Sequence, residues 1–289
     1  MPGTYIEVEI TTDPLLFDDL VGILSVKEYE GFWEEGVRLR AYIRGERWDG
    51  NHRKDLEQTV SSLAREHALP EPEIVTRLVE DQNWNALWEA DIQPVRVSER
   101  IIVAPTWHPY DPAPGEIVLT IDPKMSFGTG HHETTRLMIQ LLEKHLQPGG
   151  TMLDVGTGTG ILAIAGVKLG AVSAVGLDND EWAIGNAQEN VKLNGTQDQI
   201  SIILGEIQDL PARSFNLVAA NIQRGVIEQI LPEMRRRLGA AGRLLVSGLL
   251  DVDVEPIRAA LTAEHFRVID ELHEKEWVAL AAVLVSDHP

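Results

Sequence analysis

The stretch "LDVGTGTGILA", residues 153–163, joins an apolar run to a segment with helical spacing through a turn of alternating glycines. Glycine lets the backbone of such a turn approach a ligand closely, and the start of the following helix presents free N–H groups. Glycine turns also connect strands to helices where nothing binds, so the turn alone leaves both interpretations open. The acidic residues around it distinguish between them.

Two carboxylates near this turn indicate a nucleoside ligand that carries an amine. Asp178 ends the next apolar run, 22 residues after Gly156, where a carboxylate can accept both hydroxyls of a ribose. Asp154 precedes Gly156 by two residues, a position that is awkward beside a pyrophosphate but suits an amino-acid ammonium. The glycines follow G-x-G-x-G, through Gly158 and Gly160, whereas dinucleotide folds use G-x-G-x-x-G. The pattern therefore favours S-adenosylmethionine over NAD. The presence of Asp178 makes the other interpretation, a glycine turn that binds no ligand, the weaker one.

The segments on either side of the turn predict an α/β fold. From Ile101 onward, apolar strand-like runs alternate with helical segments, as expected for a parallel sheet that helices cover on both faces. The stretch "FRVIDELHEKEWVALAAVLVS" has two strand runs with no helix between them, which indicates a closing antiparallel hairpin. Methyltransferase folds end in this way and dehydrogenase folds usually do not. We therefore predict a Rossmann-like, class I S-adenosylmethionine-dependent methyltransferase sheet over residues 95–289.

Asn221, at the end of the fourth strand of this sheet, is a candidate for catalysis. Its side-chain carbonyl could accept an N–H from an incoming amine and direct the nitrogen lone pair toward a sulfonium methyl. The alternative is that Asn221 is an ordinary turn residue at a strand end. Its position at the carboxyl end of the sheet favours the functional interpretation.

The first eighty residues follow a different pattern. Their order β-α-β-β-α-β is the split βαβ order of a small α+β ferredoxin-like domain. In it, "NHRKDLEQTVSSLAREHAL" is expected to form an amphipathic helix with Asn51 as its N-cap. Trp84 and Trp88 then lie at helical spacing in a connecting helix that Pro94 ends, where they would pack against a neighbouring domain. The predicted domains are residues 1–80, a linker helix over 81–94, and a catalytic domain over 95–289.

The composition excludes several classes of protein. The 289 residues include 45 acidic and 25 basic side chains, a net charge of −20 that argues against a nucleic-acid partner. The negative charge either steers a basic partner toward the protein or only confers solubility. No cysteine is present, which excludes disulfides, thiolate nucleophiles and cysteine-based zinc sites. With no signal-peptide pattern and no apolar run long enough for a bilayer, we expect a soluble, cytoplasmic protein without membrane contact.

A second glycine-rich stretch, "MSFGTGHHETT" at residues 125–135, raises the question of a metal site or a catalytic pair. His131 and His132 are adjacent, so on a helix their side chains would point about 100° apart and could not easily chelate one ion. Two-histidine metal sites on helices usually have i, i+4 spacing instead. We therefore predict that His131, His132 and Glu133 begin a helix and that the protein binds no metal.

With these parts placed, the chain resembles the bacterial ribosomal protein L11 methyltransferases, the PrmA family, over roughly residues 80–289. The "FGTGHHETT" signature is highly specific, whereas the G-x-G-x-G turn is shared by many methyltransferases. The first eighty residues match in pattern but hardly in motif. The other segments that carry the resemblance are "WEADIQPVRVSERIIVAPTW", "LDVGTGTGILAIAGVKLGA", "GLDND", "NVKLNG", "VAANI", "LLVSGLL" and "KEWVAL".

The resemblance implies one cofactor site that both glycine stretches share. The "FGTG…TT" segment would fold over S-adenosylmethionine and the second stretch would be its platform. Asn221 would lie between the cofactor and the substrate and act in catalysis, and the adenine-side contact would be near Glu206. The expected cofactor-binding residues are Thr135, Asp154, Gly156, Gly158, Asp178 and Asn221.

The resemblance also implies a reaction, the transfer of methyl groups to amines of ribosomal protein L11, on lysine side chains, the N-terminal amine or both. The ferredoxin-like domain would grip the protein substrate. A lysine must first lose its proton, which at neutral pH costs about 4.6 kcal/mol. Gln223 and Arg224 stand where the family often has smaller or apolar residues, a departure at the substrate channel. The alternatives are a methyltransferase for another amine-bearing protein or metabolite, and a non-catalytic S-adenosylmethionine-binding module.

Overall fold

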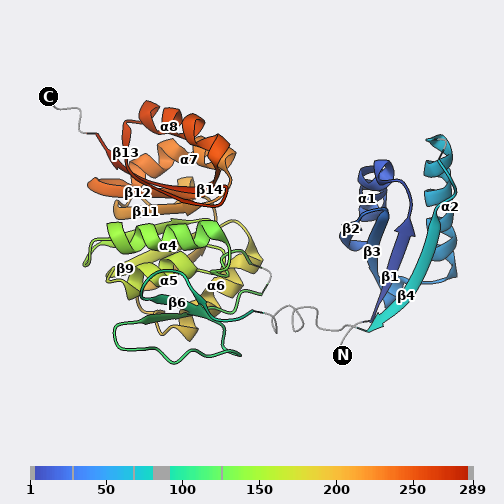
Figure 1. Cartoon of the computed structure of the whole chain (residues 1–289), viewed down its shortest axis with the longest axis horizontal. Coiled ribbons are helices and arrows are strands. Elements are labelled where there is room, and N and C mark those ends of the chain that lie inside the picture. The colour runs from blue at the N-terminus through green and yellow to red at the C-terminus, as the bar shows by residue number, and fades with distance from the viewer. Residues whose placement is uncertain (1–3, 28, 68, 81–91, 125, 286–289) are drawn as a thin grey trace. The chain divides into compact units, whose positions relative to one another are not determined.

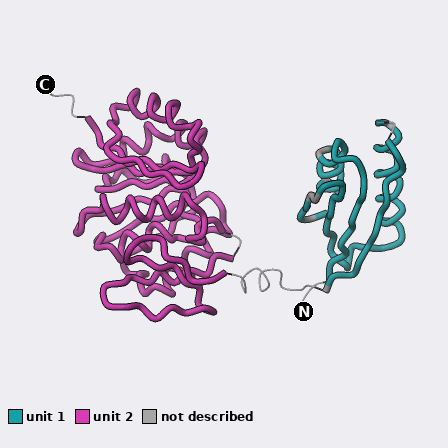
Figure 2. The backbone as a smooth tube through the Cα atoms, in the orientation of Figure 1, with its two compact units in different colours: residues 1–87 teal, residues 88–289 magenta. Residues whose placement is uncertain are grey.

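The computed structural model describes residues 4–27, 29–67, 69–80, 92–124 and 126–285. The chain forms two compact units, Met1–Leu87 and Trp88–Pro289, which Figure 2 shows in teal and magenta. The division falls inside the predicted linker helix 81–94. Its residues 81–91, with Trp84 and Trp88, lie outside the described residues, and residues 92–94 have no regular secondary structure. The domain boundaries therefore remain a prediction.

The first unit is a four-stranded sheet with two helices, the ferredoxin-like arrangement that the sequence pattern predicted. Its strand order is β2-β3-β1-β4, and each neighbouring pair is antiparallel. Its elements are β1 (Thr4–Thr11), η1 (Pro14–Leu16), α1 (Phe17–Val26), β2 (Glu30–Glu35), β3 (Arg38–Arg44), η2 (Gly45–Arg47), α2 (Gly50–Glu66) and β4 (Glu73–Glu80).

The core of this unit lies between one face of the sheet and its helices. One buried cluster joins alternating residues of β1, including Val8 and Ile10, to Leu20 of α1 and to Leu56 and Val60 of α2. The alternating apolar residues of the strand and the helically spaced apolar residues of α1 and α2 therefore form a single core.

The start of α2 corrects one expectation, because its N-cap is Asp49 and not Asn51. A carboxylate oxygen of Asp49 accepts hydrogen bonds from the backbone N–H groups of Asn51 and His52, both at 2.9 Å. Asp and Asn are similar N-cap residues, so the sequence alone could not choose between two candidates two positions apart.

The second unit contains a seven-stranded sheet of order β10-β9-β8-β11-β12-β14-β13. The strands from β10 to β12 are parallel, whereas β14 is antiparallel to both of its neighbours. The predicted parallel sheet and its closing antiparallel hairpin are therefore confirmed. The elements of this sheet and its connections are α4 (Glu133–His145), β8 (Thr151–Val155), α5 (Ile161–Lys168), β9 (Ser173–Asp178), α6 (Glu181–Leu193), β10 (Ile200–Leu204), η3 (Ile207–Asp209), β11 (Phe215–Asn221), α7 (Arg224–Arg237), β12 (Leu238–Leu250), η4 (Asp251–Asp253), α8 (Val254–Ala263), β13 (Phe266–Glu274) and β14 (Trp277–Leu284).

Helices cover both faces of the large sheet (Figure 1). One apolar cluster joins α4 and α5 to alternate residues of the central strands, and a second joins α7 and α8 to the residues between them. α5 is apolar on all sides and nearly all of its residues are buried, as expected for a helix inside a core. No helix of the described ranges is long and apolar enough to cross a membrane.

A small sheet of β5 (Val95–Arg96), β6 (Ile101–Ala104) and β7 (Ile117–Thr120), in the order β5-β6-β7, precedes the large one in the chain. This sheet was not predicted from the sequence. Its strands have two to four residues, which is too short for an alternating pattern to be recognised.

Candidate active site

The carboxyl ends of β8, β9 and β11 form the edge of the sheet where the candidate residues gather. Consecutive strands spread in opposite directions from β8, and open α/β sheets bind ligands at such a point. Two pockets of about 440 and 570 Å³ open here, called the first and the second pocket below. They share Gly156, Asp178, Asn179, Ile222 and Val226 in their walls.

The turn after β8 has the conformation that its glycines predict. Gly156, Gly158 and Gly160 have φ angles of 71°, 53° and 82°, in the left-handed region that favours glycine. The backbone N–H groups of Gly156 and Thr157 donate to the carbonyl of Leu177 at 2.8 and 2.9 Å, which fixes the turn against the end of β9. Gly156 lines both pockets and Gly158 lines the second.

Asp178 ends β9 at the wall of both pockets. One of its carboxylate oxygens accepts a hydrogen bond from the N–H of Gly158 at 2.9 Å, and the other accepts one from Asp180 at 3.1 Å. Each oxygen keeps a further lone pair, and the residue is partly exposed. The carboxylate is thus oriented by the backbone and can still accept hydrogen bonds from a ligand.

The two glycine stretches lie directly against each other. The N–H of Thr159 donates to the carbonyl of Phe127 at 2.9 Å, and its hydroxyl donates to the carbonyl of Gly128 at 2.8 Å. A Cβ atom on Gly158 would lie 2.3 Å from the carbonyl oxygen of Phe127, so only glycine allows this approach. We call residues 126–132, which pack on the turn in this way, the lid segment.

Asn190 of α6 and the C-cap residue Asn194 hold the chain that leads into the lid segment. The side-chain amide of Asn194 pairs with both the N–H and the carbonyl of Thr120, at 3.0 and 2.7 Å. Asn190 pairs in the same way with Asp122, at 2.9 and 3.3 Å, and also donates to the carbonyl of Thr159 at 2.9 Å. The "NVKLNG" segment therefore joins the chain ahead of the lid segment to the glycine turn.

The predicted helix start is confirmed at Glu133, with His132 as the N-cap and His131 just before it. α4 starts at Glu133, and Nδ1 of the N-cap residue His132 accepts from the N–H of Thr134 at 3.3 Å. The ring of His132 contacts the rings of Phe127 and Trp277 edge-on, with centroid distances of 5.2 and 4.8 Å. Within the residues that the structure describes, no group of three or more His, Asp or Glu side chains could hold a metal ion.

Ion pairs tie the start of α4 to the turn between β13 and β14. Arg136 Nε donates to the two carboxylate oxygens of Glu274 at 3.0 and 3.1 Å, and Lys275 Nζ donates to Glu133 at 2.6 Å. The hydrogen bond from Lys275 holds the pKa of Glu133 at about 2, well below its usual range. These contacts position the start of β14, where Trp277 lines the second pocket.

Three of the predicted site residues carry buried oxygens without a partner. Among the described residues, five buried side-chain oxygens accept no hydrogen bond, and Thr135, Asp154 and Asn221 contribute three of them. Buried polar atoms almost always have a partner, so this concentration fits a site that a polar ligand or water completes. Of the three residues only Asn221 lines a pocket, the second.

Asp154 lies fully buried beneath the glycine turn. One of its oxygens accepts from the hydroxyl of Thr157 at 2.6 Å. Burial raises the pKa of Asp154 to about 7, the hydrogen bond from Thr157 opposes this rise, and the charge of Asp178 adds to it. A ligand cation near the turn would favour the ionised carboxylate.

Asn221 ends β11 in the wall of the second pocket, where its register pairs it with Ser247 of β12. The pairing of β12 with β14 shifts register around Gly248, whose φ is 85° and whose Cβ would lie 2.2 Å from the carbonyl oxygen of Ile222. Gly248 and Trp277 also line the second pocket, and neither was predicted from the sequence. A glycine inside the apolar run "LLVSGLL" was the one available signal.

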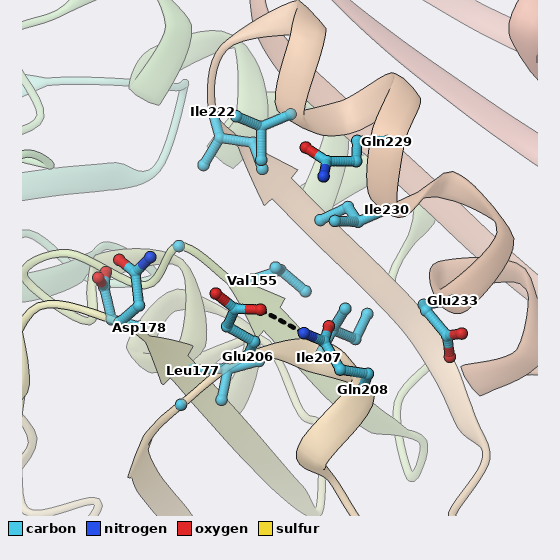
Figure 3. Close-up of a pocket in the computed structure, with 14 residues that line it drawn as sticks. Val155, Leu177, Asp178, Glu206, Ile207, Gln208, Ile222, Gln229, Ile230 and Glu233 are labelled. Carbon is cyan, nitrogen blue, oxygen red and sulfur yellow. Dashed lines mark hydrogen bonds between the residues drawn. The ribbon is translucent and has the colours of Figure 1, made fainter.

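The first pocket has apolar walls with polar groups at its edge (Figure 3). Asp178 and Glu206 lie on one side of it, and Ile222 and Ile230 lie on the other. The side-chain amide of Gln208 donates to the carboxylate of Glu206, which holds that side chain at the pocket wall. Such a pocket can accept a flat ring with polar edges, and Glu206 is where the adenine-side contact was expected.

With β8 and β11 at its centre and β14 reversed between β12 and β13, the large sheet is that of the class I S-adenosylmethionine-dependent methyltransferases. The fold class predicted from the sequence is therefore confirmed. Within this class, the chain belongs to the family described as ribosomal protein L11 methyltransferase (PrmA), whose model matches residues 11–284. The match includes most of the first unit, whose sequence motifs alone hardly resemble those of the family.

Relatives with known names support this membership. A ribosomal protein L11 methyltransferase from Chlorobaculum parvum is 36% identical over 279 residues, which cover 95% of each chain. One from Desulforapulum autotrophicum is 41% identical over 211 residues, 73% of this chain and 70% of that one. The crystal structure of a ribosomal protein L11 methylase from Lactobacillus delbrueckii subsp. bulgaricus aligns with a TM-score of 0.63 and 29% identity, covering 67% of this chain and 99% of that one.

Proposed function

We propose that this protein is an S-adenosylmethionine-dependent N-methyltransferase that methylates amino groups of ribosomal protein L11, on lysine side chains, the N-terminal amine or both. The observation that carries the proposal is the family match, which extends from residue 11 to residue 284 and so includes both units. The enzyme would act in the cytoplasm, where ribosomal proteins are made.

The residues around the glycine turn fit S-adenosylmethionine, which when bound supplies an electrophilic methyl group on a sulfonium. The carboxylate of Asp178 accepts hydrogen bonds from the ribose hydroxyls, through the lone pairs that the backbone N–H groups do not use. Gly156 and Gly158 allow the ligand to approach the backbone, and the first pocket takes the adenine beside Glu206.

Asp154 and Thr135 complete the proposed cofactor site from below. Both are buried and lie outside the pocket walls, and each has one unpartnered oxygen. Asp154 therefore acts on the ligand ammonium through its charge and through the turn that it supports by way of Thr157. Thr135, in the first turn of α4, takes part in binding the cofactor through its hydroxyl group.

Asn221 is proposed to position the accepting amine. Its unpartnered oxygen accepts an N–H of the neutral amine, which directs the nitrogen lone pair toward the methyl group. A lysine must lose its proton first, at a cost of about 4.6 kcal/mol at neutral pH. The side chains of Ile222 and Trp277 exclude water from the same wall and so favour the uncharged amine. Orientation then supplies much of the acceleration.

The two units are proposed to divide the work. Residues 1–80, the ferredoxin-like domain, grip the protein substrate, residues 81–94 connect the domains, and residues 95–289 bind the cofactor and carry out the transfer. The net charge of −20 suits a cationic protein substrate rather than a nucleic acid.

The direct test combines purified enzyme, isotopically labelled S-adenosylmethionine and ribosomal protein L11. Mass spectrometry should find label on amines of L11, and Asn221→Ala should lose most of the rate even at saturating cofactor. Label on another ribosomal protein but not on L11 would assign a different protein substrate. Tight cofactor binding without transfer to any amine would contradict an enzymatic function.

A further inference from the structure

Trp182 is the most exposed of the large apolar side chains that the structure describes, with 85% of its surface accessible. Tryptophan buries a large area in most folds, so an indole this open is unusual. Trp182 is the second residue of α6, and its backbone N–H donates to the side chain of the N-cap residue Asp180 at 2.9 Å. Its backbone is therefore fixed while its indole stays free to contact a partner.

Trp182 lies in the chain between residues that line the second pocket. Asp180 and Ala183, on either side of it in the chain, both line that pocket, as does Asn221. The lid segment is held to the same helix, because Lys124, just ahead of it, pairs with Glu189 of α6. Trp182 thus directly precedes a residue of the wall of the pocket that the accepting amine is proposed to enter.

The charge around Trp182 favours a cationic partner. Asp178 and Asp180 line the second pocket, exposed Glu181 precedes Trp182, and the described lining residues include no lysine or arginine. A lysine or arginine side chain is attracted both by these carboxylates and by the face of the indole, which is the best cation–π partner among the side chains. Trp182 itself lines neither the first nor the second pocket, so its indole is not needed to form either wall.

We propose that Trp182 is an anchor on the catalytic unit for a cationic segment of the protein substrate. The segment docks on the indole next to the target residue while the target amine enters the second pocket. This inference rests on the proposed function. It adds a substrate contact on the catalytic unit to the grip assigned to the first unit.

The test compares Trp182→Ala with wild type, using the full chain, S-adenosylmethionine and intact ribosomal protein L11. The KM for L11 should rise about fivefold or more, the effect of losing roughly 1 kcal/mol of cation–π and contact energy. Cofactor affinity by calorimetry and the melting temperature without substrate should stay unchanged. Trp182→Phe should recover part of the KM, because it keeps an aromatic face.

Val252→Ala is the matched control, because Val252 is 79% exposed, lies in η4 and lines neither pocket. It should leave every one of these quantities unchanged. A wild-type KM in Trp182→Ala would overturn the inference, as would an equal loss of cofactor affinity, which would place the indole in the cofactor site. A lower melting temperature in Trp182→Ala would show that the indole packs on the protein itself and would also overturn it. Wild-type enzyme that leaves L11 unmethylated would overturn the proposed function and this inference together, whereas the other outcomes affect the inference alone.

Discussion

At the scale of single residues, the carboxylate of Asp178 is already oriented by two backbone N–H groups before a ligand arrives. Asp178→Ala should weaken S-adenosylmethionine binding by about 1.5–3 kcal/mol, the range for hydrogen bonds to a charged group. Titration calorimetry on the folded variant measures the change. Asp178→Asn, which keeps the shape and one acceptor, should lose less. Unchanged affinity in Asp178→Ala would rule out the ribose contact.

The buried carboxyl group of Asp154 predicts that the free energy of unfolding of the protein depends on pH. Its folded pKa of about 7 lies above the ordinary value of 3.8, so the protonated form is favoured by folding. As the pH rises from about 4 to 7, the unfolded chain ionises first and the free energy of unfolding falls, by on the order of 4 kcal/mol from this group.

The variant Asp154→Asn isolates this effect. Without cofactor, it should gain stability over wild type as the pH rises toward 7, and the difference should vanish below about pH 3, where Asp154 is protonated in both the folded and the unfolded wild type. Denaturant unfolding at several pH values provides the measurement. Parallel curves for the two proteins across this range would mean that Asp154 is ionised in the fold.

At the scale of elements, the contact between the lid segment and the glycine turn depends on missing side chains. Gly158→Ala would place a methyl group 2.3 Å from a backbone oxygen at a φ of 53°, and should cost about 1–3 kcal/mol and reduce cofactor affinity. Gly185 of α6 is the matched control, because nothing lies within 4 Å of its Cβ position. Gly185→Ala should stabilise the protein by about 0.5–1 kcal/mol. Thermal unfolding of the two variants measures these changes. Unchanged stability in Gly158→Ala would contradict the close contact between the glycine turn and the lid segment.

The start of α4 gives a second prediction for an element. His132→Ala removes an N-cap and two ring contacts, so stability should fall by about 1 kcal/mol or more, whereas His132→Asn keeps the cap and should lose less. Chelators should leave activity intact, and elemental analysis should find no stoichiometric metal. One zinc or iron per chain that disappears in His131→Ala would reverse this interpretation of the histidines.

The elements also show where prediction from the sequence ends. The large sheet, the ferredoxin-like order and the helix start at Glu133 follow from local periodicity and capping, and the structure contains them. The contact of Thr159 with Phe127, and the place of Trp277 in the second pocket, arise from pairings between distant segments that no single segment marks. The choice of Asp49 over Asn51 as the N-cap depends on the chain direction before α2, which composition does not encode.

At the scale of the whole molecule, the division into two units predicts separable functions. A fragment that starts near Gln93 should bind S-adenosylmethionine but should not methylate ribosomal protein L11, because the grip on the substrate is proposed to lie in the first unit. The large sheet has apolar clusters on both faces, enough for an independent core. Methylation of L11 at the full-length rate would contradict the role of the first unit. Lost cofactor binding in a folded fragment would show that the boundary is misplaced.

The position of β14 constrains how the enzyme is made. It is the last strand of the large sheet along the chain, yet it lies between β12 and β13. Until it is inserted, β13 lacks its only partner among the described strands, β12 keeps an open edge, and Trp277 cannot reach the ring of His132. A nascent chain therefore exposes strand edges that invite wrong pairing. The second pocket becomes complete only after residues 277–284 have left the ribosome that synthesises them.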